Sequence, residues 1–333
     1  MKIECPTCHK VYNIPEERLG SKDSVAFPCP ACKGTIEIRI GAESVPEKPT
    51  NGDGEDLKKR ILKSVGVLPP MPQTFYKARE IMNDPNSSFD QLADILEADP
   101  AIAAQVLKMA NSPYYGMSGK VSSIHHASVV LGQKTLGELI NMAGASQLLG
   151  NTLEGYELDS EDVWRHSMGV AFGSKMIANK KNPALADDAF AAGLLHDVGK
   201  LILDPYVLKR KASFKAFMAD QSRSFLDAEK EILGFDHSEI ASEVCKTWNV
   251  PESLATAIRC HHFPSQTEDD KLTYIVHMAD ATAMMTGLGL GIDGILYQMD
   301  DRAAAILGLK EEDISETMIG VVEAVENLST QIQ

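Results

Sequence analysis

Four of the six cysteines lie in the first 40 residues, in two pairs with the same internal spacing. The pattern is Cys5-x2-Cys8 followed, after 20 residues, by Cys29-x2-Cys32. Each pair can direct two thiolates at one ion, and two pairs complete a tetrahedral all-sulfur shell. Such a shell selects zinc or iron, and zinc is favoured because no second redox group is implied. The alternative, four unrelated thiols, accounts poorly for two equally spaced pairs.

A shell closed by four thiolates has no open coordination position, which favours a structural or docking role over catalysis. So short a segment cannot hold itself together by burial alone, so the metal is expected to supply its folding energy. The sequences Cys5-Pro6-Thr7-Cys8 and Cys29-Pro30-Ala31-Cys32, with Tyr12, Ile14 and Leu19 between them, resemble the small bacterial zinc-ribbon family. The remaining cysteines, Cys245 and Cys260, are interpreted as buried small hydrophobic residues.

Histidines and aspartates interrupt the apolar faces of several helices predicted downstream. The residues on these faces are His166, Asp197, His261, His262 and Asp280. One such residue alone is more often a satisfied hydrogen-bonding group in the core than a metal ligand. Burying an ionised aspartate without a partner is very costly, however, and here two recur on separate apolar faces. The adjacent pair His196-Asp197, with histidines from other helices, can surround a divalent ion that neutralises the carboxylates.

His166, His196-Asp197 and Asp280 together resemble the HD superfamily of metal-dependent phosphohydrolases. The run His196-Asp197-Val198-Gly199-Lys200 is similar to the motif of the HD-GYP cyclic-dinucleotide phosphodiesterases. The resemblance implies one or two divalent metals, with iron, manganese and magnesium as candidates. Asp197 would bridge the two ions and Lys200 would meet a phosphate oxygen, which are catalytic roles if the site is active. The implied ligands are, for one ion, His166, His196, Asp197 and Asp280 and, for the other, Asp197, His237, His261 and His262.

A second resemblance covers roughly residues 57 to 270 and is more particular. The segments Leu68-Pro69-Pro70-Met71-Pro72, Ile95 to Pro100, Val106 to Ser112 and Ser123 to Gly132 are similar to the HDOD domain. HDOD proteins are generally regulatory, and the Gly-Tyr-Pro loop of the phosphodiesterases is replaced here by Phe263-Pro264-Ser265-Gln266. The resemblance therefore implies a signal-transduction protein that acts through protein–protein interaction, with an active phosphohydrolase as the alternative.

The elements that must position these residues are mainly helices. The alternating run Thr35 to Ile40 predicts a strand in the ribbon, whereas apolar spacing from Leu57 onward is helical. Asp99-Pro100 has the signature of a helix start, and Asp236-x-x-Glu239 predicts a capping box that would fix His237. The expected fold is mainly α. Its parts are a zinc ribbon (1–40), a flexible linker (41–56), a helical HDOD domain (57–310, with lobes 57–150 and 160–310) and a C-terminal helix (311–333).

Composition limits the classes of partner. The net charge of −15 counts against non-specific binding to nucleic acid or anionic membrane. In residues 1–40, six basic and five acidic side chains nearly balance, and a zinc–tetrathiolate centre adds about −2, so the ribbon has no basic footprint for nucleic acid. No apolar run approaches a membrane span, and no secretory signal begins the sequence, so we expect a cytoplasmic protein whose partners are other signalling proteins.

Overall fold

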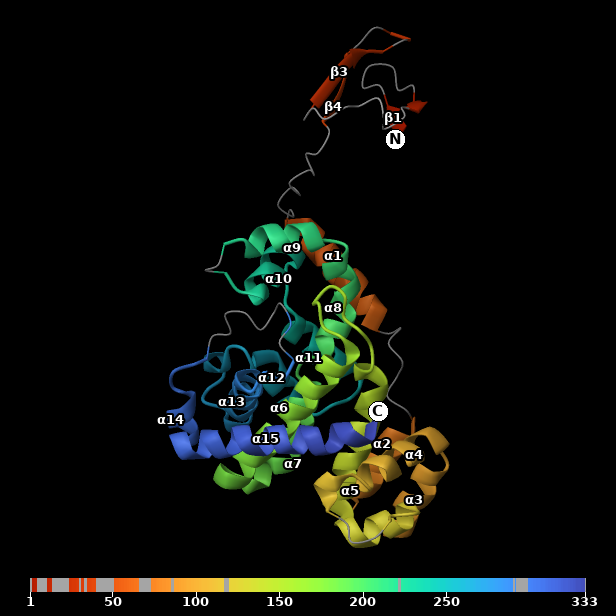
Figure 1. Ribbon diagram of the computed structural model, residues 1–333, viewed down its shortest axis with the longest axis vertical. Helices are drawn as coiled ribbons and strands as arrows, with labels where there is room; N and C mark the ends of the chain where they lie inside the picture. The colour runs from red at the N-terminus through yellow and green to blue at the C-terminus, as the bar shows by residue number, and fades with distance from the viewer. Residues whose placement is uncertain are drawn as a thin grey trace. The chain divides into compact units, whose positions relative to one another are not determined.

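The computed structural model of the 333-residue chain divides into two compact units, Met1–Lys48 and Pro49–Gln333. The structure describes residues 2–4, 11–13, 24–29, 31–32, 35–39, 51–65, 73–84, 87–116, 120–220, 223–289, 291 and 299–332. Each unit is treated by itself (Figure 1).

The first unit is built from short strands. Strand β1 (Lys2–Glu4) pairs antiparallel with β2 (Val11–Asn13), and β3 (Ser24–Pro28) pairs antiparallel with β4 (Thr35–Arg39). The strand predicted from the alternating run at Thr35 is therefore confirmed as β4. Cys29 follows β3 directly and is buried, whereas Cys32 is exposed.

The second unit is helical. Its first helices are α1 (Asn51–Val65), α2 (Gln73–Asn83), α3 (Phe89–Glu97), α4 (Pro100–Ala110) and α5 (Ile124–Leu149). They are followed by α6 (Ser160–Lys181), α7 (Ala186–Leu195), α8 (Val198–Leu208), α9 (Lys211–Met218), α10 (Phe225–Leu233), α11 (His237–Thr247), α12 (Glu252–Cys260), α13 (Lys271–Met285), α14 (Ala303–Leu307) and α15 (Glu311–Ile332). The expected fold class, mainly α with a small β ribbon, is confirmed.

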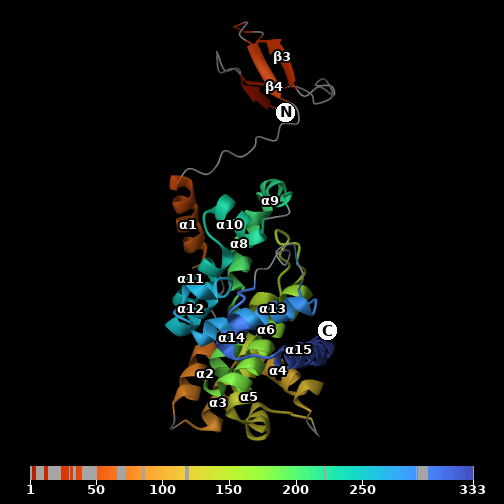
Figure 2. The ribbon, with the colours of Figure 1, turned by 90° about the vertical axis from the view of Figure 1, so that its left-hand side faces the viewer.

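Helices α2 to α5 form one group at one end of this unit in both views (Figures 1 and 2). Local sequence signals set its boundaries as expected. The Asp99 carboxylate accepts hydrogen bonds from the first amides of α4, with Pro100 in the first turn. After α4, the Asn111 side chain bonds to both backbone groups of Val121, which ties the following loop to the helix end.

The second group is centred on α6, which packs against α7, α13 and α15. Small residues on α6 permit this close packing. An added Cβ at Gly173 would lie 3.3 Å from side-chain atoms of both Ala279 on α13 and Val321 on α15. The C-terminal helix α15 also contacts α4, so it spans both groups of helices (Figure 1). The core is therefore continuous between the two groups.

Helix α1 differs from the expectation in two ways. It begins at Asn51, inside the segment 41–56 expected to be a flexible linker; residues 41–50 lie outside the described part of the chain. Three acidic residues near its start favour a helix N-terminus, although the segment has few large apolar residues. It also packs against α8, α10 and α11, where Lys58 forms an ion pair of 2.9 Å with Glu239, rather than joining the α2–α5 group.

Within the part of the chain that the structure describes, no helix combines the length and the hydropathy that crossing a bilayer requires.

Candidate metal centre

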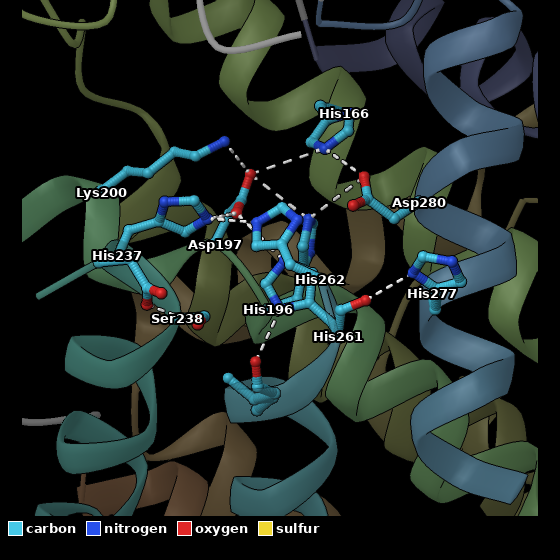
Figure 3. Close-up of polar contacts among 12 residues, drawn as sticks. His166, His196, Asp197, Lys200, His237, Ser238, His261, His262, His277 and Asp280 are labelled. Carbon is cyan, nitrogen blue, oxygen red and sulfur yellow. Dashed lines mark hydrogen bonds and ion pairs between the residues drawn. The ribbon is translucent and has the colours of Figure 1, made fainter. Parts of the chain in front are cut away.

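Seven histidine and aspartate side chains converge in the α6–α13 group, and most come from helix ends. His196 and Asp197 occupy the short turn between α7 and α8. His237 is the first residue of α11, and His261 and His262 follow the last residue of α12. Only His166 and Asp280 come from helix interiors, on α6 and α13 (Figure 3). Every histidine and aspartate predicted for this site is thus brought into one cluster.

Asp197 lies at the centre of the cluster, between His166 and His196 on one side and His237 and His261 on the other. Its Oδ2 atom lies 3.6 Å from His166 Nε2 and 3.4 Å from His196 Nε2. Its Oδ1 atom lies 3.3 Å from His237 Nε2 and 4.0 Å from His261 Nε2. One carboxylate therefore has one oxygen for each half, the arrangement that a bridging ligand needs (Figure 3).

Asp280 lies beside His166 and His196. Its Oδ1 atom lies 3.2 Å from His166 Nε2 and 3.8 Å from His196 Nε2. On the other side of Asp197, His237 Nε2 and His262 Nε2 lie 2.8 Å apart. Donor atoms that could share one ion fall into three groups, each within 4.8 Å: Asp197, His237, His261 and His262; His166, His196 and Asp197; and His196, His261 and Asp280. We name the first group the His237 half-site and the second group, together with Asp280, the His166 half-site.

The Nδ1 atoms of four histidines are already engaged, which fixes the rings. His166 Nδ1 bonds to the Leu288 carbonyl at 3.1 Å, His196 Nδ1 to that of Gly193 at 2.8 Å, and His261 Nδ1 to that of Ile258 at 2.6 Å. A carbonyl can only accept, so each of these Nδ1 atoms carries a proton, and the Nε2 atom on the other side of each ring faces the cluster. Metal-ligating histidines are oriented in this way by their second nitrogen.

The fourth histidine is held by a carboxylate that the sequence analysis missed. Glu229 on α10 accepts from His237 through the same Oε2 atom twice, from Nδ1 at 2.8 Å and from the backbone N–H at 3.0 Å. Glu229 is fully buried. A signal was present, because Glu229 lies on the apolar face of its helix, four residues after Phe225 and four before Leu233.

The cluster fits divalent ions by the chemistry of its donors. Among the described residues, His196 Nε2 and His261 Nε2 are fully buried nitrogens without a hydrogen-bond partner, and Asp197 Oδ1 has no hydrogen bond either. Buried polar atoms are normally satisfied, so their convergence indicates a missing partner that accepts lone pairs. Imidazole nitrogens with carboxylates suit zinc, iron or manganese.

The pKa values of the site follow from burial and neighbouring charge. Burial raises the pKa of Asp197 and Asp280, but the surrounding histidines, with Lys200 at Asp197, outweigh it and hold both pKa values far below the ordinary range. Burial, reinforced by His196, lowers the pKa of His261 to about 3, so this ring is neutral and free to ligate. Burial also lowers the pKa of His237, but Glu229 and Asp197 reverse this and raise it to about 10. A metal at His237 must therefore displace a proton.

Lys200 lies in the first turn of α8, where its ammonium donates to Asp197 Oδ2 at 2.5 Å. It is buried, and its Nζ lies 5.9 Å from the centre of the Tyr156 ring. The phosphate-binding role implied by the family resemblance therefore stays a prediction, because in this structure the ammonium neutralises the bridging carboxylate.

Two neighbouring features complete the surroundings. His277, a buried residue of α13, bonds through Nδ1 to the His261 carbonyl at 2.7 Å and accepts through Nε2 from the Asp300 backbone N–H at 2.9 Å. It supports the turn that carries His261 and His262 (Figure 3). Phe263, where the Gly-Tyr-Pro loop of the phosphodiesterases would begin, lies beneath the Lys230 ammonium, 4.4 Å from its ring centre.

The predicted capping box at His237 is half formed. The Asp236 carboxylate accepts from the Glu239 N–H at 2.9 Å, which confirms the N-cap. The Glu239 side chain pairs with Lys58 instead.

In the predicted four-cysteine site, Cys29 and Cys32 lie within the described residues, whereas Cys5 and Cys8 lie outside them. Cys245 and Cys260 are both buried, as expected.

Comparison with known proteins gives two family matches and several relatives. Residues 68–264 match the HDOD domain and residues 1–37 match a zinc-ribbon domain. An uncharacterized protein of Treponema pallidum (strain Nichols) is 23% identical over 219 residues, which cover 65% of this chain and 42% of that protein. The chain thus spans about two-fifths of the length of this curated relative.

Solved structures share the helical fold. An HDOD domain protein of unknown function from Geobacter sulfurreducens is 26% identical, with a TM-score of 0.64 over 81% of this chain and 97% of that one. A protein of Shewanella amazonensis SB2B, provisionally named a phosphohydrolase, is 24% identical, with a TM-score of 0.65 over 82% and 98%. A protein of Marinobacter aquaeolei VT8, provisionally named a signal transduction protein, is 20% identical, with a TM-score of 0.65 over 94% and 76%. The last two show the fold alone. Because the HDOD match covers more than half of the sequence and the fold agrees, the chain belongs to the HDOD domain family.

Proposed function

We propose that this chain is a regulatory HDOD protein of signal transduction whose helical site binds one or two divalent ions and which acts through other proteins. The observation that supports this most is the burial of the donor set. His196 and His261 are 0% exposed and Asp197 is 8% exposed. Only His262 is partly exposed. A site so enclosed suits an ion that stabilises one arrangement of helices better than it suits rapid exchange of a bulky phosphoester.

The ligands would be those of the two half-sites. His166, His196 and Asp280 would hold one ion and His237, His261 and His262 the other, with Asp197 between them. An ion bound there would neutralise the buried carboxylates and act as a Lewis acid toward an oxygen ligand. The chain's own residues fix the geometry, because four Nδ1 atoms are held by acceptors before any ion binds.

The proposed partners are signalling proteins in the cytoplasm, and the zinc ribbon would serve as a docking module. A closed four-thiolate zinc site supports a fold rather than chemistry. The overall charge of −15 counts against nucleic acid as the partner.

A second candidate, a metal-dependent phosphohydrolase, is favoured by one specific observation. Asp197 directs one oxygen to each half-site, and Lys200 lies within 2.5 Å of it. A carboxylate that bridges two metal ions, with the Lys200 ammonium beside it, is an arrangement that can clamp a phosphoryl group. Lys200 would then leave Asp197 for a phosphate oxygen.

Elemental analysis of the full chain, purified without chelator, tests the metal sites. We expect zinc in the ribbon and at least one further divalent ion per chain. Cys29→Ser should remove the ribbon zinc and leave the ion of the helical site. Asp197→Asn should remove the ion of the helical site and leave the ribbon zinc. One zinc per chain, lost in Cys29→Ser and retained in Asp197→Asn with nothing else bound, would refute the helical metal site.

A panel of cyclic and linear phosphoesters separates the two functions. The regulatory proposal expects no turnover by the metal-loaded chain. Hydrolysis that disappears in both Asp197→Asn and His196→Gln would replace it with the second candidate, since a contaminating hydrolase would survive both changes.

A further inference from the structure

A buried chain of hydrogen bonds leads away from the His237 half-site. Tyr156 donates its hydroxyl to Glu229 Oε1 at 2.5 Å, and Glu229 Oε2 accepts from His237 Nδ1 at 2.8 Å. Tyr156 and Glu229 are both fully buried. The two carboxylate oxygens are thus divided, one for the tyrosine and one for the metal-facing histidine.

Tyr156 belongs to the loop that joins the two groups of helices. This loop runs from Gly150, at the end of α5, to Asp159, the N-cap of α6. It is closed on itself, because the Leu153 N–H donates to the Leu158 carbonyl at 2.8 Å and the Leu158 N–H donates back at 3.1 Å. The connection between the groups is therefore a compact turn with Tyr156 at its centre.

The same loop is fastened to the helix that begins after the bridging aspartate. The Gly155 N–H donates to Asp204 Oδ1 on α8 at 2.7 Å, and an added Cβ at Gly155 would lie 2.7 Å from the Asp204 carbonyl oxygen. Lys200, also on α8, lies over the Tyr156 ring. A movement of the loop therefore reaches the His237 half-site by two routes, through Glu229 and through α8.

His237 differs in this respect from the other three anchored histidines. His166, His196 and His261 bond through Nδ1 to backbone carbonyls, whereas His237 bonds to a side chain. A side-chain carboxylate can shift with its partner while the backbone stays in place. The orientation of His237 is thus the one most open to adjustment from a distance.

We propose that Tyr156 and Glu229 are positioning residues that couple metal binding at the His237 half-site to the loop between the two groups of helices. This inference rests on the proposed metal-binding function. When the half-site is filled, the His237 ring is fixed, Glu229 is fixed with it, and the Tyr156 loop is held closed. When the loop opens, Glu229 loses a partner and the half-site weakens, because binding and loop closure are linked reciprocally.

The affinity test uses Mn²⁺ and the full chain with its ribbon zinc in place, since thiolates keep zinc in preference to manganese. Wild type and His262→Gln are each titrated with Mn²⁺ by calorimetry. The binding event that wild type shows and His262→Gln lacks is assigned to the His237 half-site, and its Kd is the affinity compared below. Glu229→Gln keeps the shape but removes the charge that holds His237, and we expect this affinity to fall 10- to 100-fold, as for other partners of metal-bound histidines. Glu231→Gln, an exposed glutamate on the same helix, should bind as wild type does.

The coupling itself is read by hydrogen–deuterium exchange of the peptide that contains the Leu153–Leu158 amides. Saturating Mn²⁺ should slow its exchange in wild type. In Tyr156→Phe, which retains the ring and every metal ligand, Mn²⁺ should still bind but should no longer slow exchange in the loop. A merely structural tyrosine would change the exchange rate equally with and without Mn²⁺.

Two results would overturn the coupling. One is a folded Glu229→Gln protein with wild-type Mn²⁺ affinity; the other is loop exchange in wild type that does not respond to bound Mn²⁺. A wild-type chain that binds no Mn²⁺ at its histidines would instead overturn the proposed function, and the inference with it, so the two failures are distinguishable.

Discussion

Gly199 lies where the backbones of α8 and α11 pack closely, and replacing it with alanine is a demanding test of the site geometry. Gly199 lies in the first turn of α8, two residues after Asp197. An alanine Cβ there would lie 1.9 Å from the His237 carbonyl oxygen and 2.8 Å from the Ala241 amide nitrogen, both on α11. These are backbone atoms, so no side-chain rotation can relieve the overlap. Helices α8 and α11 must separate by about 1.5 Å to restore ordinary van der Waals contact.

The size of the effect follows from this displacement. Overpacking typically costs 1–3 kcal/mol, and an obstacle made of backbone places Gly199→Ala near the upper end, about 3 kcal/mol. Alanine returns up to about 1 kcal/mol of helix propensity, which leaves a net loss of about 2 kcal/mol. For a unit of this size that lowers the Tm by about 4–8 °C.

Gly199→Ala should reduce the metal affinity of the site more strongly than it reduces the free energy of unfolding. Asp197 precedes α8 and His237 begins α11, with 3.3 Å between Asp197 Oδ1 and His237 Nε2. Metal–ligand distances tolerate about 0.2 Å, so a separation several times larger should abolish binding at the His237 half-site. Thermal unfolding followed by circular dichroism, with EDTA present, measures the first effect, and Mn²⁺ titration measures the second.

Gly137→Ala on α5 is the matched control. Its added Cβ would lie 2.1 Å from Met82 Cε, which is the end of a flexible side chain rather than backbone. We expect its Tm to change little and its Mn²⁺ affinity to be that of wild type. A Gly199→Ala protein that matched wild type in both measurements would refute the argument from close packing, and so would equal damage from the two glycine substitutions.

Three further predictions address metal removal, an ion pair and a supporting histidine. Removing Mn²⁺ that is present at about 100 times its Kd should cost about 2.7 kcal/mol and lower the Tm by about 5–11 °C, a shift that Asp197→Asn should lack; an equal shift in that variant would assign the stabilisation to another site. Lys175→Met leaves the buried Glu138 carboxylate without its cation and should cost about 3 kcal/mol. Burial, partly offset by Lys175, raises the pKa of Glu138, so the folded state binds this proton more readily than the unfolded state does. Without Lys175 the pKa of Glu138 should rise further in the folded variant, so protonation of Glu138 at low pH should stabilise the variant more than wild type. The stability lost in Lys175→Met should therefore shrink as the pH falls from 8 to 5 in denaturant titrations. A loss that does not depend on pH would show that it does not come from the unpaired Glu138 carboxylate. His277→Ala leaves the His261 carbonyl and the Asp300 N–H without their partner and should cost about 2–3 kcal/mol while weakening Mn²⁺ binding; unchanged binding would show that His277 supports only the fold.

The sequence carries more information about this site than about the elements around it. A histidine or aspartate on an apolar helix face must point into the core, so His166 and Asp280 could be placed from helical periodicity alone. His237, the first residue of its helix, needed the family resemblance, because a helix end offers too few turns for periodicity to assign a face. Their common meeting point depends on how six helices pack, which no local pattern contains.

Other features were beyond local reasoning for definite physical reasons. Tyr156 lies in a short turn without periodicity, and its partner Glu229 is 73 residues away. Helix α1 was placed with its neighbours in sequence, but it packs on α8, α10 and α11, because the choice between two apolar surfaces depends on tertiary contacts. Glu229 was within reach, since a glutamate between apolar residues four positions away on either side carries the same signal that identified Asp280.

Charge balance limits what the site can bind. Asp197, Asp280 and Glu229 supply three negative charges, and Lys200 supplies one positive charge in direct contact with Asp197. One divalent ion, bound with loss of the His237 proton and with the other rings neutral, brings this buried group to neutrality. A second ion would leave an excess of two positive charges in a site that excludes most water, which is costly unless an anion enters with it. Occupancy of both half-sites is thus expected to depend on an anionic ligand, such as a phosphate group, that can draw Lys200 away from Asp197. The same ligand would be a substrate if the site hydrolyses it and a signal if the site only binds it. The regulatory and hydrolytic hypotheses therefore both require binding of a phosphate group and differ in whether the bound phosphoester is cleaved.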